Sequence, residues 1–107
     1  MDKIKISKLL NESGKIFKLE ISGLFILDNS EYVKNEFVKL IDELFDEVHI
    51  IVTDLEDIDL SCIQLFVALF KEMDKKRIHY SIEWNIDDDQ KFLIENIGLS
   101  NELYIDN

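Results

Sequence analysis

The sequence is short of the residues that interrupt or cross-link a chain. It has no proline and only three glycines among 107 residues, so short loops and no flexible linker are expected. Its single cysteine, Cys62, cannot form an internal disulfide, which fits a reducing cytosol. No apolar run approaches the ~20 residues of a membrane-spanning helix, and no apolar signal segment follows the first residues, which argues against export. These absences predict one cytoplasmic domain over residues 1–107.

Positive charge is also scarce. Lys and Arg number 12 against 23 Asp and Glu, giving a formal net charge of −11. Such a surface repels phosphate backbones and anionic headgroups, so neither nucleic-acid binding nor direct membrane insertion is expected. It favours a protein partner with a basic surface, approached under electrostatic steering.

The apolar pattern predicts four strands. Phe17, Leu19 and Ile21 alternate with polar residues, as on a half-buried strand, and Gly23 is expected to end that strand. A continuous, largely β-branched run predicts a central strand covered on both faces. The expected strands are 4–6, 15–22, 48–53 and 77–84.

Apolar spacings of three and four residues predict three helices, at 29–45, 61–75 and 87–97. Asp28 with Glu31, and Ser61 with Gln64, have the spacing of capping boxes at the first two helix starts. The order β-β-α-β-α-β-α predicts an α/β fold, in which a mixed β-sheet is packed against helices.

The last helix begins at a run of acids, Asp87–Asp89. This run lacks the spacing of a calcium loop, so the helix dipole explains it and no metal site is predicted. The helix is expected to turn Phe92, Leu93 and Ile97 inward and to stop at Gly98, with 99–105 packing back on the body.

No catalytic motif is visible. The glycines are too widely separated for a phosphate-binding loop, so no nucleotide cofactor is expected. A cysteine nucleophile needs a nearby base, but His49 and His79 lie in predicted strands while Cys62 enters an apolar helix. A packed core role for Cys62 is therefore favoured. An enzyme that uses Cys62 or the acidic loop is the least favoured hypothesis.

The remaining candidate site is the junction between an acidic loop, 54–59, and the second helix. Ser61 fits two roles there: an N-cap, worth about 1 kcal/mol, or a phosphoacceptor at a helix start. The acidic loop and this helix start are predicted to form a docking surface for a basic partner. The predicted partner-binding residues are Asp54, Glu56, Asp57, Asp59, Leu60, Cys62 and Gln64.

The segment 48–69 resembles the core of the STAS domain, the fold of bacterial anti-sigma-factor antagonists. The family pattern is an apolar strand, a loop, and then Asp-Ser-Ser-Gly-Leu-Gly opening a helix. Laid on without gaps, Asp59 matches the acidic residue and Ser61 matches the phosphorylated serine. The segment departs from the pattern at Leu60, Cys62 and Gln64, which replace a serine and two glycines. Its motif is most similar to free-standing STAS proteins of chemotaxis systems.

This resemblance implies a non-enzymatic regulatory binding module, similar to an anti-sigma-factor antagonist and switched by phosphorylation of Ser61. Its implied partner is an anti-sigma-factor-type serine kinase or a chemotaxis signalling protein. The alternative is an accessory STAS subunit of a bacterial lipid-transport ATPase complex, in which Ser61 only caps a helix. The sequence leaves the oligomeric state open.

Overall fold

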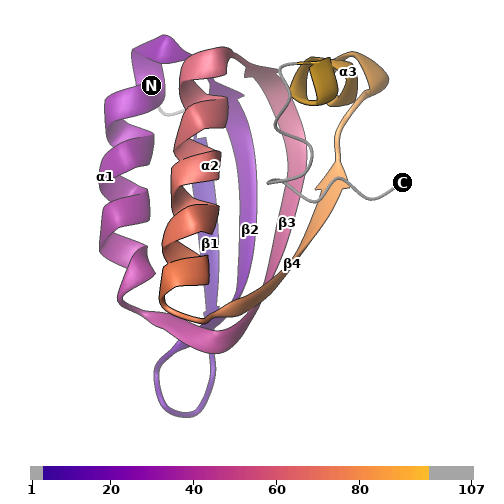
Figure 1. Ribbon diagram of the computed structural model, residues 1–107. Helices are drawn as coiled ribbons and strands as arrows, with labels where there is room; N and C mark the ends of the chain where they lie inside the picture. Colours follow the sequence, from indigo (N-terminus) through magenta and orange to yellow (C-terminus); the bar gives the residue numbers. More distant parts are fainter. Residues whose placement is uncertain (1–3, 97–107) are drawn as a thin grey trace.

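The computed structural model describes residues 4–96, in which α-helices pack against a β-sheet (Figure 1). A short 3-10 turn, η1 (Leu27–Asn29), precedes the first helix. Ile97, Gly98 and the segment 99–105 lie outside the described residues, so the expectations for them stay predictions. The strands are β1 (Ile4–Leu10), β2 (Ile16–Phe25), β3 (Leu44–Ile58) and β4 (His79–Asn85), and the helices are α1 (Ser30–Ile41), α2 (Leu60–Lys75) and α3 (Asp88–Asn96).

The sheet is mixed, as predicted. Its strand order is β1-β2-β3-β4, with β1 antiparallel to β2 and the other neighbours parallel. The β1–β2 hairpin turns at Asn11, whose side-chain Oδ1 accepts hydrogen bonds from the N–H groups of Ser13 and Lys15 at 2.9 and 3.0 Å. Gly14 completes this turn with φ +81°, a value that glycine adopts without strain.

Helices α1 and α2 pack side by side on one face of the sheet (Figure 1). The core between them and the sheet is built around Phe66 of α2, which is fully buried. Four aromatic rings lie 5.4–6.2 Å from its ring centroid, those of Phe25, Phe37, Phe70 and Trp84. This packing fixes α2, and hence its N-terminal end, against β2 and β4.

The face of β3 that points away from the helices is left partly exposed, contrary to the prediction. Val48, Ile50 and Val52 are buried against the helices, but the alternate positions His49, Ile51 and Thr53 are only half-buried. The prediction of a strand covered on both faces is wrong because α1 and α2 both pack on the same side (Figure 1). A continuous apolar run did not distinguish one buried face from two.

Several helices and strands also begin or end at residues other than those predicted. Helix α1 ends at Ile41, because Leu44 and Phe45 already belong to β3. The capping box at Asp28 is absent, and the N-cap Asn29 makes no side-chain capping bond. Gly23 does not end β2; it lies within the strand at φ +123°, beside a shift in register against β3.

The predicted acidic loop is largely strand. Residues 54–58 continue β3, and between the pairs Ile21–Val52 and Leu24–Asp57 β2 advances by three residues while β3 advances by five. Asp54 lies in this bulged stretch with φ +52°, a conformation that Asp tolerates better than most residues. The bulges turn Leu55 and Ile58 into the core and leave the acidic side chains exposed.

Helix α3 begins as its acidic run predicts. The Asp87 carboxylate accepts a hydrogen bond from the N–H of Gln90 at 2.8 Å, and the Gln90 amide donates to the Leu55 carbonyl at 3.0 Å. The second contact ties α3 to β3. The inward prediction for Phe92 is wrong: its side chain is 62% exposed, while Ile94 is fully buried.

Candidate functional site

The site at the start of α2 is organised by the carboxylate of Asp59. Asp59 is the N-cap residue, with extended backbone, and its Oδ1 accepts from the N–H of Cys62 at 3.3 Å. Its other oxygen, Oδ2, accepts from the N–H of Leu27 at 2.8 Å. One side chain therefore caps α2 and holds the turn that precedes α1.

Ser61 is the third partner of this carboxylate. Its hydroxyl donates to Asp59 Oδ1 at 2.6 Å, and the residue is half-buried. The capping prediction for Ser61 is wrong, because the serine donates to the cap residue rather than accepting from a backbone N–H. The capping box with Gln64 is replaced by this Asp59 cap.

The hydrogen bonds hold the pKa of Asp59 below its ordinary value of 3.8. Partial burial alone raises this pKa, but the Ser61 hydroxyl and the N–H groups of Leu27 and Cys62 favour the charged form and outweigh burial. The group is therefore an anion at neutral pH. A second negative charge on Ser61 would lie close to the Asp59 carboxylate and would be repelled by it.

Cys62 lies beneath this cluster and does not reach the surface. Its side chain is fully buried, and its thiol donates to the Ile26 carbonyl at 3.5 Å. Burial and the Asp59 charge raise the pKa of Cys62 to about 11, so it carries a thiol rather than a nucleophilic thiolate at neutral pH. The predicted core role is confirmed. The prediction of Cys62 as a partner-binding residue is wrong, because no atom of its side chain is available to a partner.

The family model of the STAS domain matches residues 7–107. The chain belongs to the STAS domain family. No curated protein matches it in sequence.

Two solved structures share the fold of this STAS domain. An anti-sigma factor antagonist from Mycobacterium paratuberculosis superposes with a TM-score of 0.68 at 12% identity, covering 91% of this chain and 81% of that one. The Bacillus cell fate determinant SpoIIAA, in its phosphorylated form, gives a TM-score of 0.64 at 15% identity, covering 92% and 86%. At such identities the likeness concerns the fold.

The other predicted site residues of the STAS domain lie on the two elements that meet at Asp59, the end of β3 and the start of α2. Asp54, Glu56 and Asp57 are exposed on the bulged end of β3, and Leu60 and Gln64 are exposed on the first turns of α2. Sequence reasoning missed Leu27, which is 65% exposed and bonded to Asp59 through its N–H. The available signal was the position of Leu27, the last residue of the apolar run 24–27, directly before the polar residues 28–30. We call this set the α2-start surface: Leu27, Asp54, Glu56, Asp57, Leu60, Ser61 and Gln64.

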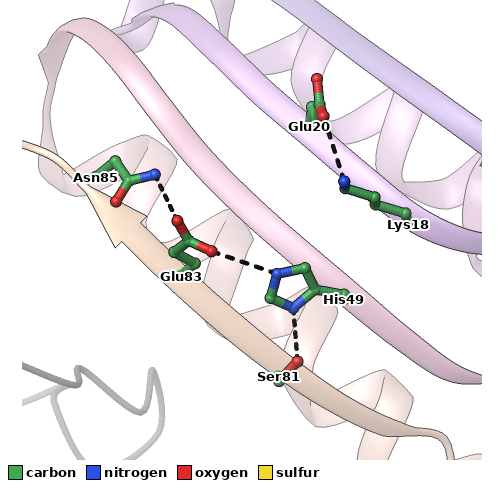
Figure 2. Close-up of polar contacts among 6 residues, drawn as sticks. All are labelled: Lys18, Glu20, His49, Ser81, Glu83 and Asn85. Atoms are coloured by element: carbon green, nitrogen blue, oxygen red, sulfur yellow. Dashed lines mark hydrogen bonds and ion pairs between the residues drawn. The ribbon is translucent and has the colours of Figure 1, made fainter.

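A second polar cluster lies on the sheet face away from α1 and α2 (Figure 2). His49 Nδ1 lies 2.8 Å from Ser81 Oγ, and His49 Nε2 lies 3.4 Å from Glu83 Oε1. The hydrogen bond from Asn85, more than the nearby His49 and Lys18, holds the pKa of Glu83 below its ordinary value against the opposing effect of desolvation.

The order serine, histidine, carboxylate resembles a hydrolytic triad, but Ser81 lies within a strand. It is therefore not at a helix N-terminus, where N–H groups would stabilise an oxyanion. Within residues 4–96 there is no group of three or more His, Cys, Asp or Glu placed to hold a metal ion. Over the same residues, no helix is long and apolar enough to cross a membrane.

Proposed function

We propose that this STAS domain is a regulatory protein-binding module whose α2-start surface docks on a protein partner and is switched by phosphorylation of Ser61. One observation carries the proposal: the Ser61 hydroxyl is held at 2.6 Å from the ionised Asp59, at a helix start surrounded by exposed residues. An enzyme is disfavoured here, because the only cysteine is a buried thiol.

The physical effect of a phosphate at this position is a local change of charge. Esterification removes the proton that Ser61 donates to Asp59 and adds about −1.5 to −2 charge. At ~4 Å each unit pair repels by about 4 kcal/mol at an effective dielectric of 20, and by about 1 kcal/mol in bulk water. The helix N-terminus stabilises the phosphate by only roughly 0.3–1 kcal/mol. The phosphate therefore swings toward solvent and alters the surface that a partner must desolvate.

Ser61→Asp is expected to fold and to bind the partner at least about tenfold more weakly, since about 1.4 kcal/mol corresponds to that factor. Ser61→Ala is expected to bind normally, to escape phosphorylation, and to lose about 1 kcal/mol of stability with its hydrogen bond. Binding is measured by titration against the partner captured with the unmodified domain. Mass spectrometry of protein from its own cells locates the phosphate.

Asn35→Asp serves as the matched control, because Asn35 is exposed midway along α1 and does not belong to the α2-start surface. It adds the same charge and should leave affinity unchanged. Equal affinity of Ser61→Asp and the unmodified domain, with no phosphate on Ser61, would leave the serine as only a partner of the Asp59 cap.

The chemistry of the α2-start surface also specifies the partner. It combines three exposed acids, Asp54, Glu56 and Asp57, with two exposed leucines, Leu27 and Leu60. A complementary partner presents basic side chains around an apolar depression, as an anti-sigma-factor-type serine kinase would have to do. The two biological settings predicted from the sequence, chemotaxis signalling and lipid transport, stay predictions.

Association with this partner should slow as salt rises, because exposed charges are screened beyond about 8 Å at physiological ionic strength. Asp57→Lys should slow it further and flatten the salt dependence. Stopped-flow or surface-plasmon-resonance association rates at several salt concentrations measure both effects. An association rate that responds to neither salt nor Asp57→Lys would remove this surface from the interface.

A further inference from the structure

A hollow lined by residues of the β1–β2 hairpin lies away from the α2-start surface. It is a groove of about 1040 Å³ beside His49, enclosed by the β1–β2 hairpin and the first residues of β3 and β4. The hairpin lies at the opposite end of the sheet from the start of α2 (Figure 1). Nothing in the proposed function uses this groove.

Large apolar side chains lie exposed in the groove. Leu10 is 56% exposed, Phe17 40% and Phe45 38%, and all three line the hollow. Sequence periodicity assigned Phe17 to the core face of its strand, but Ile16 occupies the buried position instead. Exposed apolar side chains gathered in one concavity and rimmed by polar residues are typical of interaction sites.

The groove arises from an irregularity in the sheet. Between the pairs Ile16–Leu44 and Lys18–His49, β2 advances by two residues while β3 advances by five. The extra residues of β3 bulge at this point and carry Phe45 and Glu47 into the lining. Bulges of this kind redirect side chains at the borders of functional sites.

One wall of the groove is held in place by hydrogen bonds. His49 is fixed on both ring nitrogens, by Ser81 at 2.8 Å and Glu83 at 3.4 Å (Figure 2). His79, at the start of β4, adds a second imidazole to the lining. A wall ordered before binding lowers the entropy lost when a ligand docks.

The charged residues that line the groove indicate which class of ligand fits it. Two carboxylates, Glu12 and Glu47, line the groove, and no Lys or Arg is among its described lining residues. The nearby Lys18 is paired with Glu20 at 3.8 Å (Figure 2). A second copy of this chain would bring a net charge of −11 against the same acids. Like charges would oppose that contact.

We infer that this groove binds a short cationic segment of a protein, with an aromatic or leucine anchor on Leu10, Phe17 and Phe45 and Lys or Arg beside Glu12 and Glu47. The site is separate from the α2-start surface. Binding here does not depend on the phosphorylation state of Ser61.

Three synthetic 12-residue peptides test this inference on the full chain. The first carries lysines and two tryptophans; the second has serine in place of tryptophan; the third has glutamate in place of lysine. Backbone amide chemical shifts, followed by NMR during titration, give both affinity and location. The first peptide should bind at least about tenfold tighter than the others, with shifts concentrated at the hairpin and the starts of β3 and β4.

Paired variants separate the groove from general attraction to an acidic protein. Glu12→Lys with Glu47→Lys should weaken the first peptide about tenfold, whereas Glu31→Lys with Glu56→Lys, equally exposed at the other end, should change it less than about twofold. Leu10→Ser should also weaken binding several-fold, and Leu60→Ser, at 50% exposure on α2, should not.

The inference is overturned if the serine peptide binds as tightly as the tryptophan peptide, if the shifts map to the start of α2, or if both double variants lose affinity equally. A dimer seen by sedimentation equilibrium and abolished by Leu10→Ser would also overturn it, in favour of a second copy as occupant. Ser61→Asp should bind the first peptide like the unmodified domain, so this test stands apart from the phosphorylation proposal.

Discussion

Phe66→Ala is expected to lower the free energy of unfolding by about 3–5 kcal/mol. Phe66 is fully buried, and four aromatic rings surround it within 6.2 Å between centroids. Truncation removes the apolar transfer energy of the ring and leaves a cavity that rings from three other elements cannot all fill. Urea unfolding followed by tryptophan fluorescence measures the change, since Trp84 is one of the neighbours.

Phe92→Ala is the matched control for this substitution. The Phe92 side chain is 62% exposed on α3, so the same truncation should cost less than about 0.5 kcal/mol. If Phe66→Ala leaves too little folded protein to measure, Phe66→Leu keeps most of the volume and should fall between the two. Equal losses for Phe66→Ala and Phe92→Ala would contradict the central position of Phe66 in the core.

Asp59→Ala is expected to cost about 2–3 kcal/mol at neutral pH, more than an ordinary helix cap. It removes the cap of α2, worth about 1 kcal/mol, and also the charged acceptor of Leu27 and Ser61. Hydrogen bonds to charged groups contribute about 1.5–3 kcal/mol. Glu56→Ala, an exposed acid three residues earlier, should change stability by less than about 0.5 kcal/mol.

The cost of Asp59→Ala should also depend on pH. The pKa of Asp59 is lower in the folded state than its ordinary value of 3.8, so the folded protein favours the ionised group. The resulting stability is present above the unfolded pKa and is lost as pH falls through the folded one. The difference in unfolding free energy between the unmodified domain and Asp59→Ala should therefore narrow below about pH 4. A difference that stays constant from pH 7 to pH 3 would contradict the role assigned to the charge.

Sequence periodicity was sufficient for the fold because most elements obey one dominant period. Alternation in 77–84 predicted β4, and the spacing of Val33, Phe37 and Leu40 predicted the buried face of α1. The same reasoning failed where a strand is irregular. The stretch 54–58 looks like a loop in sequence because two bulges break the alternation, yet Leu55, Asp57 and Ile58 still pair with β2.

The candidate site was predictable in location and not in its internal roles. The strand–acid–serine–helix order located the site at the start of α2. Which oxygen caps the helix depends on the direction of two neighbouring side chains, and the structure assigns the cap to Asp59 and the donor role to Ser61. Leu27 is 32 residues from Asp59 in sequence, so no local pattern could reveal the hydrogen bond between them. The groove was hidden for other reasons: alternation placed Phe17 on the core face of its strand, and Phe45 was predicted to end a helix rather than to lie in β3.

Strand β3 carries bulges near both of its ends, and they serve different surfaces. Those near Asp54 present acids beside the start of α2, while the one near Phe45 opens the groove by the hairpin. The domain measures 38 Å along its longest axis, and Phe45 and Asp54 are nine residues apart along β3, roughly 30 Å for an extended chain. A short segment bound in the groove therefore leaves the start of α2 uncovered. If both proposals hold, the consequence is a ternary complex, in which the domain tethers a cationic segment while a second protein binds and leaves the α2-start surface.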